Sequence, residues 1–220
     1  MLSLTPASAE LIGIHTGDGT LYETNWKTLV WESRGHLEEK EYYVNKVTPM
    51  VNKLFNLDLQ SKWRNGGHYG VWGIQTTNKL VTQFMLDAGF KPGPKSQIIT
   101  VPDYIWESSL KIQKSFIRGY FDTDGSFDVE KINSNILHTY PRVSFSTVCK
   151  NFSDQFNELL KTLRFRTSAW YSTGAYYIAL VGDKQAHKWF KAIKPHNTKH
   201  LKKYLFWKEH GFYEPFLEIN

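Results

Sequence analysis

The sequence predicts an α+β fold of two pseudo-symmetric αββαββα halves, packed together through one helix from each half. Two observations predict this fold. The segment LIGIHTGDGTL (residues 11–21) recurs as IRGYFDTDGSF (residues 117–127), so that Asp18 and Asp124 hold matching positions in the two copies. The helix and strand patterns that follow each segment also recur in the same order. A single copy would indicate little more than a turn, because glycine and aspartate are common turn residues.

In the first half, the motif helix is followed by strands, a helix, further strands and a second helix. Strand patterns come in two pairs, at residues 23–27 with 29–33 and at residues 61–66 with 69–76. The helix between the pairs is predicted from apolar residues at helical spacing: Val44, Val47, Val51 and Leu54. Gly66 and Gly67 fit a hairpin turn. Asn78 is placed to cap the last helix of this half.

The second half repeats this order of elements. Its strand patterns lie at residues 142–147, 166–172 and 175–181. Its central helix is predicted from Phe152, Phe156, Leu159, Leu160 and Leu163. Thr173 and Gly174 supply the hairpin turn, and Asp183 is expected to cap a helix as Asn78 does in the first half.

The repeat divides the chain at a segment that has no helical period. The run PGPKSQIITVP (residues 92–102) contains three prolines, which are typical of a connection between folded units. We therefore expect an N-terminal half at residues 1–93, a junction at 94–115 and a C-terminal half at 116–220.

The composition excludes several classes of protein and site. The single cysteine, Cys149, excludes an intrachain disulfide and a thiolate zinc site. No apolar run approaches the about 20 residues of a membrane span, and the opening residues lack the pattern of a signal peptide. We expect an intracellular protein, in the cytoplasm or an organelle matrix, that is neither secreted nor bound to a membrane.

The charge is compatible with a polyanionic partner. The 27 Lys and Arg residues exceed the 21 Asp and Glu residues, which gives a formal net charge of +6. Basic residues crowd one late stretch: Lys191, Lys194, Lys199, Lys202, Lys203 and Lys208. This stretch fits a solvated helix face as well as it fits a nucleic-acid surface.

The small residues of the two motifs indicate how the motif helices pack. Gly13 and Gly17 lie four residues apart on one helix face, and Gly119 and Thr123 take the same places in the second motif. Small residues let two helix backbones approach closely. The final glycine of each motif is expected to end its helix in a left-handed conformation.

Such packing would bring Asp18 and Asp124 together at two adjacent helix C-termini. Both the helix dipoles and the second carboxylate oppose negative charge there. Hard divalent cations would offset both, and oxygen ligands suit Mg²⁺, with Mn²⁺ as the alternative.

At these residues the chain resembles the LAGLIDADG homing endonucleases, through LIGIHTGDG (residues 11–19) and IRGYFDTDG (residues 117–125). The resemblance covers nearly the whole chain. The first copy departs from the family pattern by Thr16 in place of the first acid and by Ile12 in place of alanine. The second acid, at Asp18 and Asp124, is present in both copies.

The resemblance implies a single-chain, magnesium-dependent nuclease, intron-encoded or free-standing. It implies two antiparallel sheets that bind double-stranded DNA across roughly twenty base pairs, two turns of the duplex. No obligate protein partner is expected. The metal ligands implied are the Asp18 and Asp124 carboxylates and the Gly17 and Thr123 backbone carbonyls. Lys95 and Lys199 are the candidates for the basic residues that stabilise the transition state, although a lysine that only contacts phosphate fits each of them equally well.

DNA contacts are expected along the strands and the basic stretch. The candidates are Lys27, Lys62, Arg64, Arg142, Arg166, Tyr171, Lys202 and Lys203. Among these, the arginines can bond guanine through two parallel hydrogen bonds. His15 lies inside the first motif, but Phe121 takes its place in the second, so we interpret this histidine as structural.

Two alternatives remain open at this point. A non-cleaving relative, such as an RNA maturase or a DNA-binding regulator, would keep the fold without the chemistry. An unrelated metal-dependent nuclease or phosphatase would need more acids near each motif, where Asp122 and Asp128 are the nearest neighbours. The presence of both motif acids favours the endonuclease.

Overall fold

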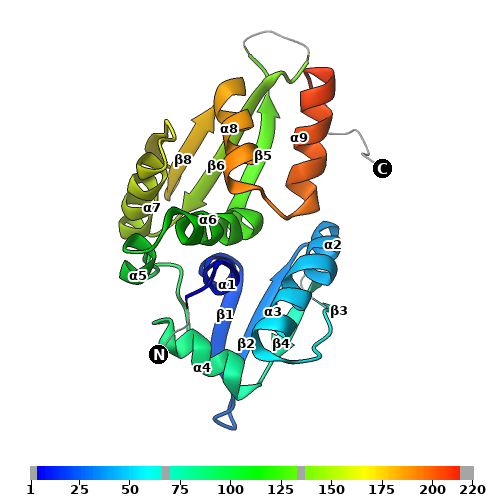
Figure 1. Ribbon diagram of the computed structural model, residues 1–220, viewed down its shortest axis with the longest axis vertical. Coiled ribbons are helices and arrows are strands. Elements are labelled where there is room, and N and C mark those ends of the chain that lie inside the picture. The colour runs from blue at the N-terminus through cyan, green and yellow to red at the C-terminus, as the bar shows by residue number, and fades with distance from the viewer. Residues whose placement is uncertain (1–3, 66–69, 133–136, 214–220) are drawn as a thin grey trace.

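A computed structural model describes residues 4–65, 70–132 and 137–213 and shows a mixed α+β fold of two similar halves (Figure 1). The first half contains α1 (Pro6–Thr16), β1 (Gly19–Glu23), β2 (Leu29–Gly35), η1 (Leu37–Glu39), α2 (Lys40–Tyr42), the π-helical turn η2 (Tyr43–Val47), α3 (Thr48–Phe55), β3 (Lys62–Arg64), β4 (Val71–Thr76) and α4 (Lys79–Asp87). The second half follows α5 (Asp103–Trp106) and contains α6 (Leu110–Asp124), β5 (Gly125–Glu130), β6 (Tyr140–Thr147), α7 (Lys150–Thr162), β7 (Ser168–Ser172), β8 (Ala175–Val181), α8 (Asp183–Ile193) and α9 (Thr198–His210).

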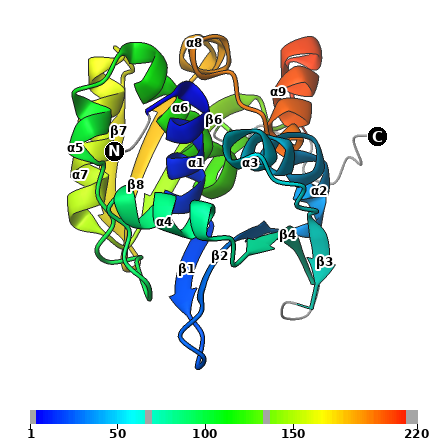
Figure 2. The same ribbon diagram turned by 60° about the horizontal axis from the view of Figure 1, so that its bottom comes forward.

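Each half holds one four-stranded antiparallel sheet, and the two sheets have the same topology. The strand orders are β1-β2-β4-β3 and β5-β6-β8-β7. Alternate strand residues are buried, as Val143 and Phe145 are in β6, because one face of each sheet is covered by helices. The β1–β2 hairpin projects from the side of the molecule away from α8 (Figure 2). The predicted fold class is confirmed.

The motif helices α1 and α6 pack against each other between the two sheets (Figure 1). A Cβ atom added to Gly13 would lie 2.1 Å from the Phe116 carbonyl oxygen, and one added to Gly119 would lie 2.1 Å from the Glu10 carbonyl oxygen. The two contacts are equivalent, because Gly13 and Gly119, like Glu10 and Phe116, hold corresponding positions in the two copies of the repeat. Backbone therefore lies directly on backbone at both crossing points, which only glycine permits.

The last glycine of each motif does not take the expected left-handed conformation. Gly125 is extended, with φ −87° and ψ 164°, and Gly19 has no positive φ. Both residues instead begin a strand directly after the helix. An added Cβ would lie 2.4 Å from the His15 Cα at Gly19 and 2.7 Å from the Phe121 carbonyl oxygen at Gly125, so the need for glycine is steric.

Both helices begin where the sequence predicts, but only one of the two expected capping residues caps its helix. Asn78 caps α4 through its side chain, which accepts a hydrogen bond from the Leu80 amide at 2.9 Å. Asp183 does not cap α8. It is the first helical residue, and the cap is Gly182 with φ 88°. An acid in the first turn is still favourable there because of the helix dipole.

Several predicted strand segments are shorter than expected, among them those at residues 23–27 and 166–172. Residues 24–28 form the turn after β1, with Lys27 at φ 58°, so the expected strand at residues 23–27 is wrong beyond Glu23. β7 begins at Ser168, two residues after Arg166. Thr173 and Gly174 both have positive φ, which confirms the second hairpin turn. The first hairpin, predicted at Gly66 and Gly67, lies outside the described residues.

The helix α9 is an addition to the repeated pattern. Its cap, Asn197, is fully buried and reaches both halves, donating at 2.8 Å to Glu39 and at 2.7 Å to the carbonyl oxygen of Asp122. The division into residues 1–93, 94–115 and 116–220 stays a prediction. The helix α6 begins at Leu110, within the expected junction. No helix in the described part of the chain is long and apolar enough to cross a membrane.

Two buried histidines make the fold sensitive to acid. Burial lowers the pKa of His15 and of His200 from 6.5 to about 3. His15 accepts a hydrogen bond from the Trp31 indole at 3.0 Å, while the His200 ring packs 4.6 Å from Phe121. Below pH ~6.5 these histidines bind protons in the unfolded chain but stay neutral in the folded chain. Each of them therefore lowers the free energy of unfolding as the pH falls toward about 3.

We expect the free energy of unfolding to lose up to ~1.4 kcal/mol per pH unit for each histidine in this window. Urea unfolding of the wild type and of His200→Phe at pH 7, 6 and 5 checks this expectation. The advantage of the variant should grow as the pH falls. A constant difference between the two proteins would contradict it.

Candidate active site

The two motif aspartates lie at the adjoining C-terminal ends of α1 and α6. Asp18 follows the helix cap Gly17, and Asp124 is the last residue of α6. A Cβ atom added to Gly17 would lie 2.1 Å from the Thr123 hydroxyl oxygen and 3.4 Å from the carboxyl carbon of Asp124. The structure therefore brings the four residues proposed as metal ligands, Gly17, Asp18, Thr123 and Asp124, to one place.

Negative charge is unfavourable at this place. Burial, followed by the charges of Asp124 and Glu39, raises the pKa of Asp18 to about 8. The pKa of Asp124 is raised by loss of solvent and by Glu39, against the Lys95 charge. Asp124 is the more exposed of the two carboxyl groups, so solvent screens its charge more than that of Asp18. Both acids thus favour a neighbouring cation.

Glu39 is a third acid at this site that the sequence did not identify. It is buried, and it accepts hydrogen bonds from the His36 amide and the Asn197 side chain, both at 2.8 Å. Its charge raises the pKa of both motif aspartates. Only the acidic run at residues 38–41 could have pointed to it, and that run also fits an ordinary helix start.

Lys95 reaches the site from the junction segment. Its ammonium group donates to the carbonyl oxygens of Thr16, at 3.0 Å, and of Gly17. It lies in a hollow of about 290 Å³ that is also lined by Asp124. The structure therefore places Lys95 beside one motif acid, as an active-site role requires.

Lys199 approaches from the other half. It is the second residue of α9, whose cap Asn197 fixes the start of the helix between the halves. The Lys199 charge lowers the pKa of Asp18. Among the described residues, its ammonium group has no hydrogen-bond or ion-pair partner, unlike that of Lys95.

His15 has a structural place. Its ring is buried, accepts a hydrogen bond from Trp31 and packs 4.0 Å from the ring of Phe90. With its pKa lowered to about 3, it is neutral at physiological pH, and its Nδ1 atom is already engaged. The structural interpretation of this residue is supported.

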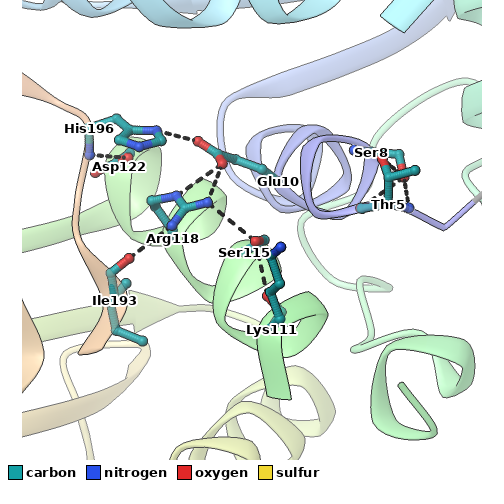
Figure 3. Close-up of polar contacts among 9 residues, drawn as sticks. All are labelled: Thr5, Ser8, Glu10, Lys111, Ser115, Arg118, Asp122, Ile193 and His196. Carbon is teal, nitrogen blue, oxygen red and sulfur yellow. Dashed lines mark hydrogen bonds and ion pairs between the residues drawn. The ribbon is translucent and has the colours of Figure 1, made fainter. Parts of the chain in front are cut away.

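A second polar cluster spans the motif helices at Glu10, Asp122 and His196, whose ligand atoms lie within 4.8 Å of one another (Figure 3). This spacing would suit a metal ion, but Arg118 already neutralises Glu10 with an ion pair of 2.6 Å. His196 also bonds Glu10, at 2.7 Å, and its amide donates to Asp122 at 2.8 Å. We therefore interpret the cluster as a polar clamp between the halves.

The open face of the first sheet carries a connected polar network. Glu32, although buried, forms an ion pair with Arg34 at 2.8 Å and lies 3.9 Å from Arg64. Gln75 accepts from Arg64 and donates to the Tyr22 hydroxyl at 2.7 Å. The network crosses all four strands and holds two guanidinium groups in fixed directions.

The open face of the second sheet is different. Ser126, Ser144 and Ser146 present small hydroxyl groups, and two separate ion pairs, Arg142–Glu130 (2.8 Å) and Lys203–Asp128 (3.1 Å), lie beside them. Trp170 and Tyr177 stack with ring centres 5.4 Å apart. These side chains suit hydroxyl and apolar contacts rather than a charged network.

The other residues predicted to contact DNA lie in several environments. Lys62 is exposed on β3 beside Arg64, whereas Lys27 is in the β1–β2 turn and Arg166 precedes β7. Tyr171 alternates with Trp170 and faces the opposite side of β7, next to Tyr176. Lys202 is exposed on α9, and Lys203 bonds Asp128 at 3.1 Å.

A divalent metal fits the site at the helix ends. The donors there are carboxylate and carbonyl oxygens, which hard cations prefer. The raised pKa values of the two acids and the lysine ammonium that already bonds the Gly17 carbonyl show that this place attracts positive charge.

Comparison with known proteins supports the resemblance carried by the motifs. Residues 111–194 match the family model of the LAGLIDADG-like domain. Mesophilic variants of the homing endonuclease I-DmoI share the fold with a TM-score of 0.60 and 15% identity, over 86% of this chain and 94% of that chain. No curated protein sequence matches the chain.

Two further structures were solved with DNA. The homing endonuclease I-WcaI, bound to its DNA recognition sequence, matches with a TM-score of 0.61 and 14% identity, over 89% of this chain and 84% of that chain. I-SmaMI, bound to uncleaved DNA target in the presence of calcium ions, matches with a TM-score of 0.60 and 10% identity, over 95% of this chain and 91% of that chain. At these identities the likeness establishes the shared fold.

Proposed function

We propose that this chain is a LAGLIDADG homing endonuclease that cuts both strands of a specific DNA site by metal-assisted phosphodiester hydrolysis. The observation that carries the proposal is the pair of motif aspartates at two adjoining helix ends, with Lys95 from the junction and Lys199 from the second half near them. A binding protein has no need for two acids whose charge is so unfavourable there. A nuclease needs both.

In the proposed reaction, the metal and the side chains of the protein have different roles. Asp18, Asp124 and the carbonyls of Gly17 and Thr123 would hold Mg²⁺ or Mn²⁺, which supplies Lewis acidity and lowers the pKa of water. Lys95 and Lys199 would offset the charge that develops on the phosphate. Each half supplies one acid, and the junction and the second half supply one lysine each, so a single chain can serve both strands without a protein partner.

The open sheet faces are proposed to bind the DNA. Each sheet would follow about one turn of the duplex, which gives a target of roughly twenty base pairs. Arg34 and Arg64, held by Glu32, are the strongest candidates for guanine recognition in the first half. I-DmoI was solved in complex with DNA and Mn, and the other two relatives were solved on DNA. This supports double-stranded DNA as the partner.

The direct test is cleavage of plasmids that carry the DNA flanking the gene, with the gene insertion removed. Magnesium-dependent linearisation at one position would establish the endonuclease and give its site. Salt-sensitive binding without any cutting would favour the non-cleaving alternative, an RNA maturase or DNA-binding regulator. Phosphatase turnover without duplex cutting would favour an unrelated hydrolase.

The affinity for DNA is expected to fall steeply with salt. A protein that neutralises about six or more phosphates loses on the order of 10³-fold in affinity between ~50 and ~200 mM salt. Filter binding across this range measures the slope. Lys62→Ala should reduce the slope by about one contact, whereas Lys161→Ala, whose lysine is paired with Glu158 on α7, should not change it. A flat salt response would contradict the proposed DNA surface.

A further inference from the structure

The Lys95 ammonium group lies where a cation ligated by the chain would lie. It bonds the carbonyl oxygens of Thr16 and Gly17 at the C-terminal end of α1, where carbonyl oxygens have no hydrogen-bond partner within the helix. The Asp124 carboxylate lines the same hollow, and its carboxyl carbon is within 3.4 Å of a Cβ position on Gly17. The Lys95 ammonium group is thus bonded to a carbonyl oxygen of one motif and lies in the same hollow as the motif aspartate of the other.

Lysine and a divalent ion would compete for these oxygens. Both need the Gly17 carbonyl oxygen, and two cations on one oxygen repel each other strongly at this distance. The ammonium carries one charge, whereas a divalent ion carries two and holds its ligands in a closer geometry. One cation therefore has to leave before the other can bind.

The other half lacks this arrangement. Within the described residues, the Lys199 ammonium bonds no backbone carbonyl, and it acts on Asp18 only through its charge. The two cation positions are consequently unequal, although the motif residues around them correspond by the repeat.

We propose that Lys95 fills the cation position formed by Gly17 and Asp124 in the free protein, and that a divalent ion binds there only by displacing the Lys95 ammonium group, which is then free to contact DNA phosphate. This inference rests on the proposed function, because it takes the motif residues to be metal ligands. At the position beside Asp18, no lysine ammonium of the described residues bonds a ligand atom, so a divalent ion binds there first. DNA phosphate would favour binding at the second position by holding the displaced Lys95.

Calorimetric titration of the free protein with Ca²⁺, without DNA, tests this inference. Lys95→Met should tighten Ca²⁺ binding on the order of tenfold, because it removes a charge from the ligand atoms themselves. Lys199→Met is the matched control and should give a clearly smaller gain. The double variant Lys95→Met with Asp124→Asn should lose the gain. Equal gains in both single variants, or none in Lys95→Met, would overturn the inference.

A labelling experiment on the wild type is independent of any variant. Acetylation of Lys95, followed by mass spectrometry, should increase when Ca²⁺ is added, because the displaced ammonium becomes accessible. The exposed Lys184 on α8 should react equally with and without Ca²⁺. Unchanged or reduced labelling of Lys95 while two Ca²⁺ ions bind would overturn the inference. Magnesium-dependent cutting alongside such a result would leave the nuclease proposal intact, and absence of cutting alongside increased labelling would remove the nuclease alone.

Discussion

Asp18→Asn and Asp124→Asn are each expected to abolish double-strand cleavage, with a loss on the order of 10³-fold or more, while DNA binding stays close to that of the wild type. Each substitution removes a carboxylate ligand at the shared helix ends, and metal stabilisation of a phosphoryl transition state is worth several kcal/mol. Binding survives because the substitutions leave the side chains of the open sheet faces unchanged. Plasmid cleavage and filter binding on the same preparations measure both effects.

A matched control is Asp183→Asn, at an exposed acid in the first turn of α8. It makes the same chemical change away from the site and should leave cleavage unchanged. Full cleavage by either motif variant would contradict a shared metal site. Nicking of one strand by a variant would instead show that the two positions act independently.

The Asp18→Asn variant is expected to gain stability although it loses cleavage activity. The folded pKa of Asp18 is raised from 3.8 to about 8, so its contribution to stability is fully present below pH ~3.8 and is lost as the pH rises through about 8. Asparagine carries no charge and avoids this loss. Metal-free Asp18→Asn should therefore be more stable than the wild type by ~2 kcal/mol near pH 8, with a smaller advantage near pH 5. The residue that destabilises the free protein is the one that the proposed chemistry needs.

The fold could be predicted because the same series of helix and strand patterns occurs twice in the chain. One weak motif becomes informative when Asp18 and Asp124 fall at matching places in two matching series of elements. The backbone contacts at Gly13 and Gly119 could be predicted for the same reason, since small residues at one face of each helix have no better explanation.

The parts that could not be predicted depend on contacts between distant segments. Glu39 reaches the site because η1 lies beside Asn197, which is 158 positions away along the chain. Trp170, rather than Tyr171, faces the open side of β7 because the strand register with Tyr177 decides the face. A one-residue shift in register exchanges the two faces, and no local pattern in an exposed edge strand fixes that register.

The glycine misassignment has a related cause. A glycine after a helix usually indicates a left-handed cap, but Gly19 and Gly125 lead straight into strands that pack back on their own helices. Sequence alone shows that glycine is required at a position. It does not separate a conformational reason from a steric one.

Gly13→Ala and Gly119→Ala are expected to destabilise the protein by ~3 kcal/mol each, near the upper end for overpacking. The new methyl group would meet a backbone carbonyl oxygen of the facing helix at 2.1 Å, and backbone cannot rotate away as a side chain can. The two helices would have to separate along their whole contact. That movement would also part Asp18 from Asp124, so cleavage measured at a temperature where the variant is folded should fall together with stability.

Gly174→Ala is the control: its Cβ would meet nothing within 4 Å, and only its φ of 84° opposes the change, at a cost of ~1 kcal/mol. Urea unfolding ranks the three variants. If Gly119→Ala were no less stable than Gly174→Ala, the helices would not be held backbone to backbone, and the close approach on which the shared site depends would be refuted.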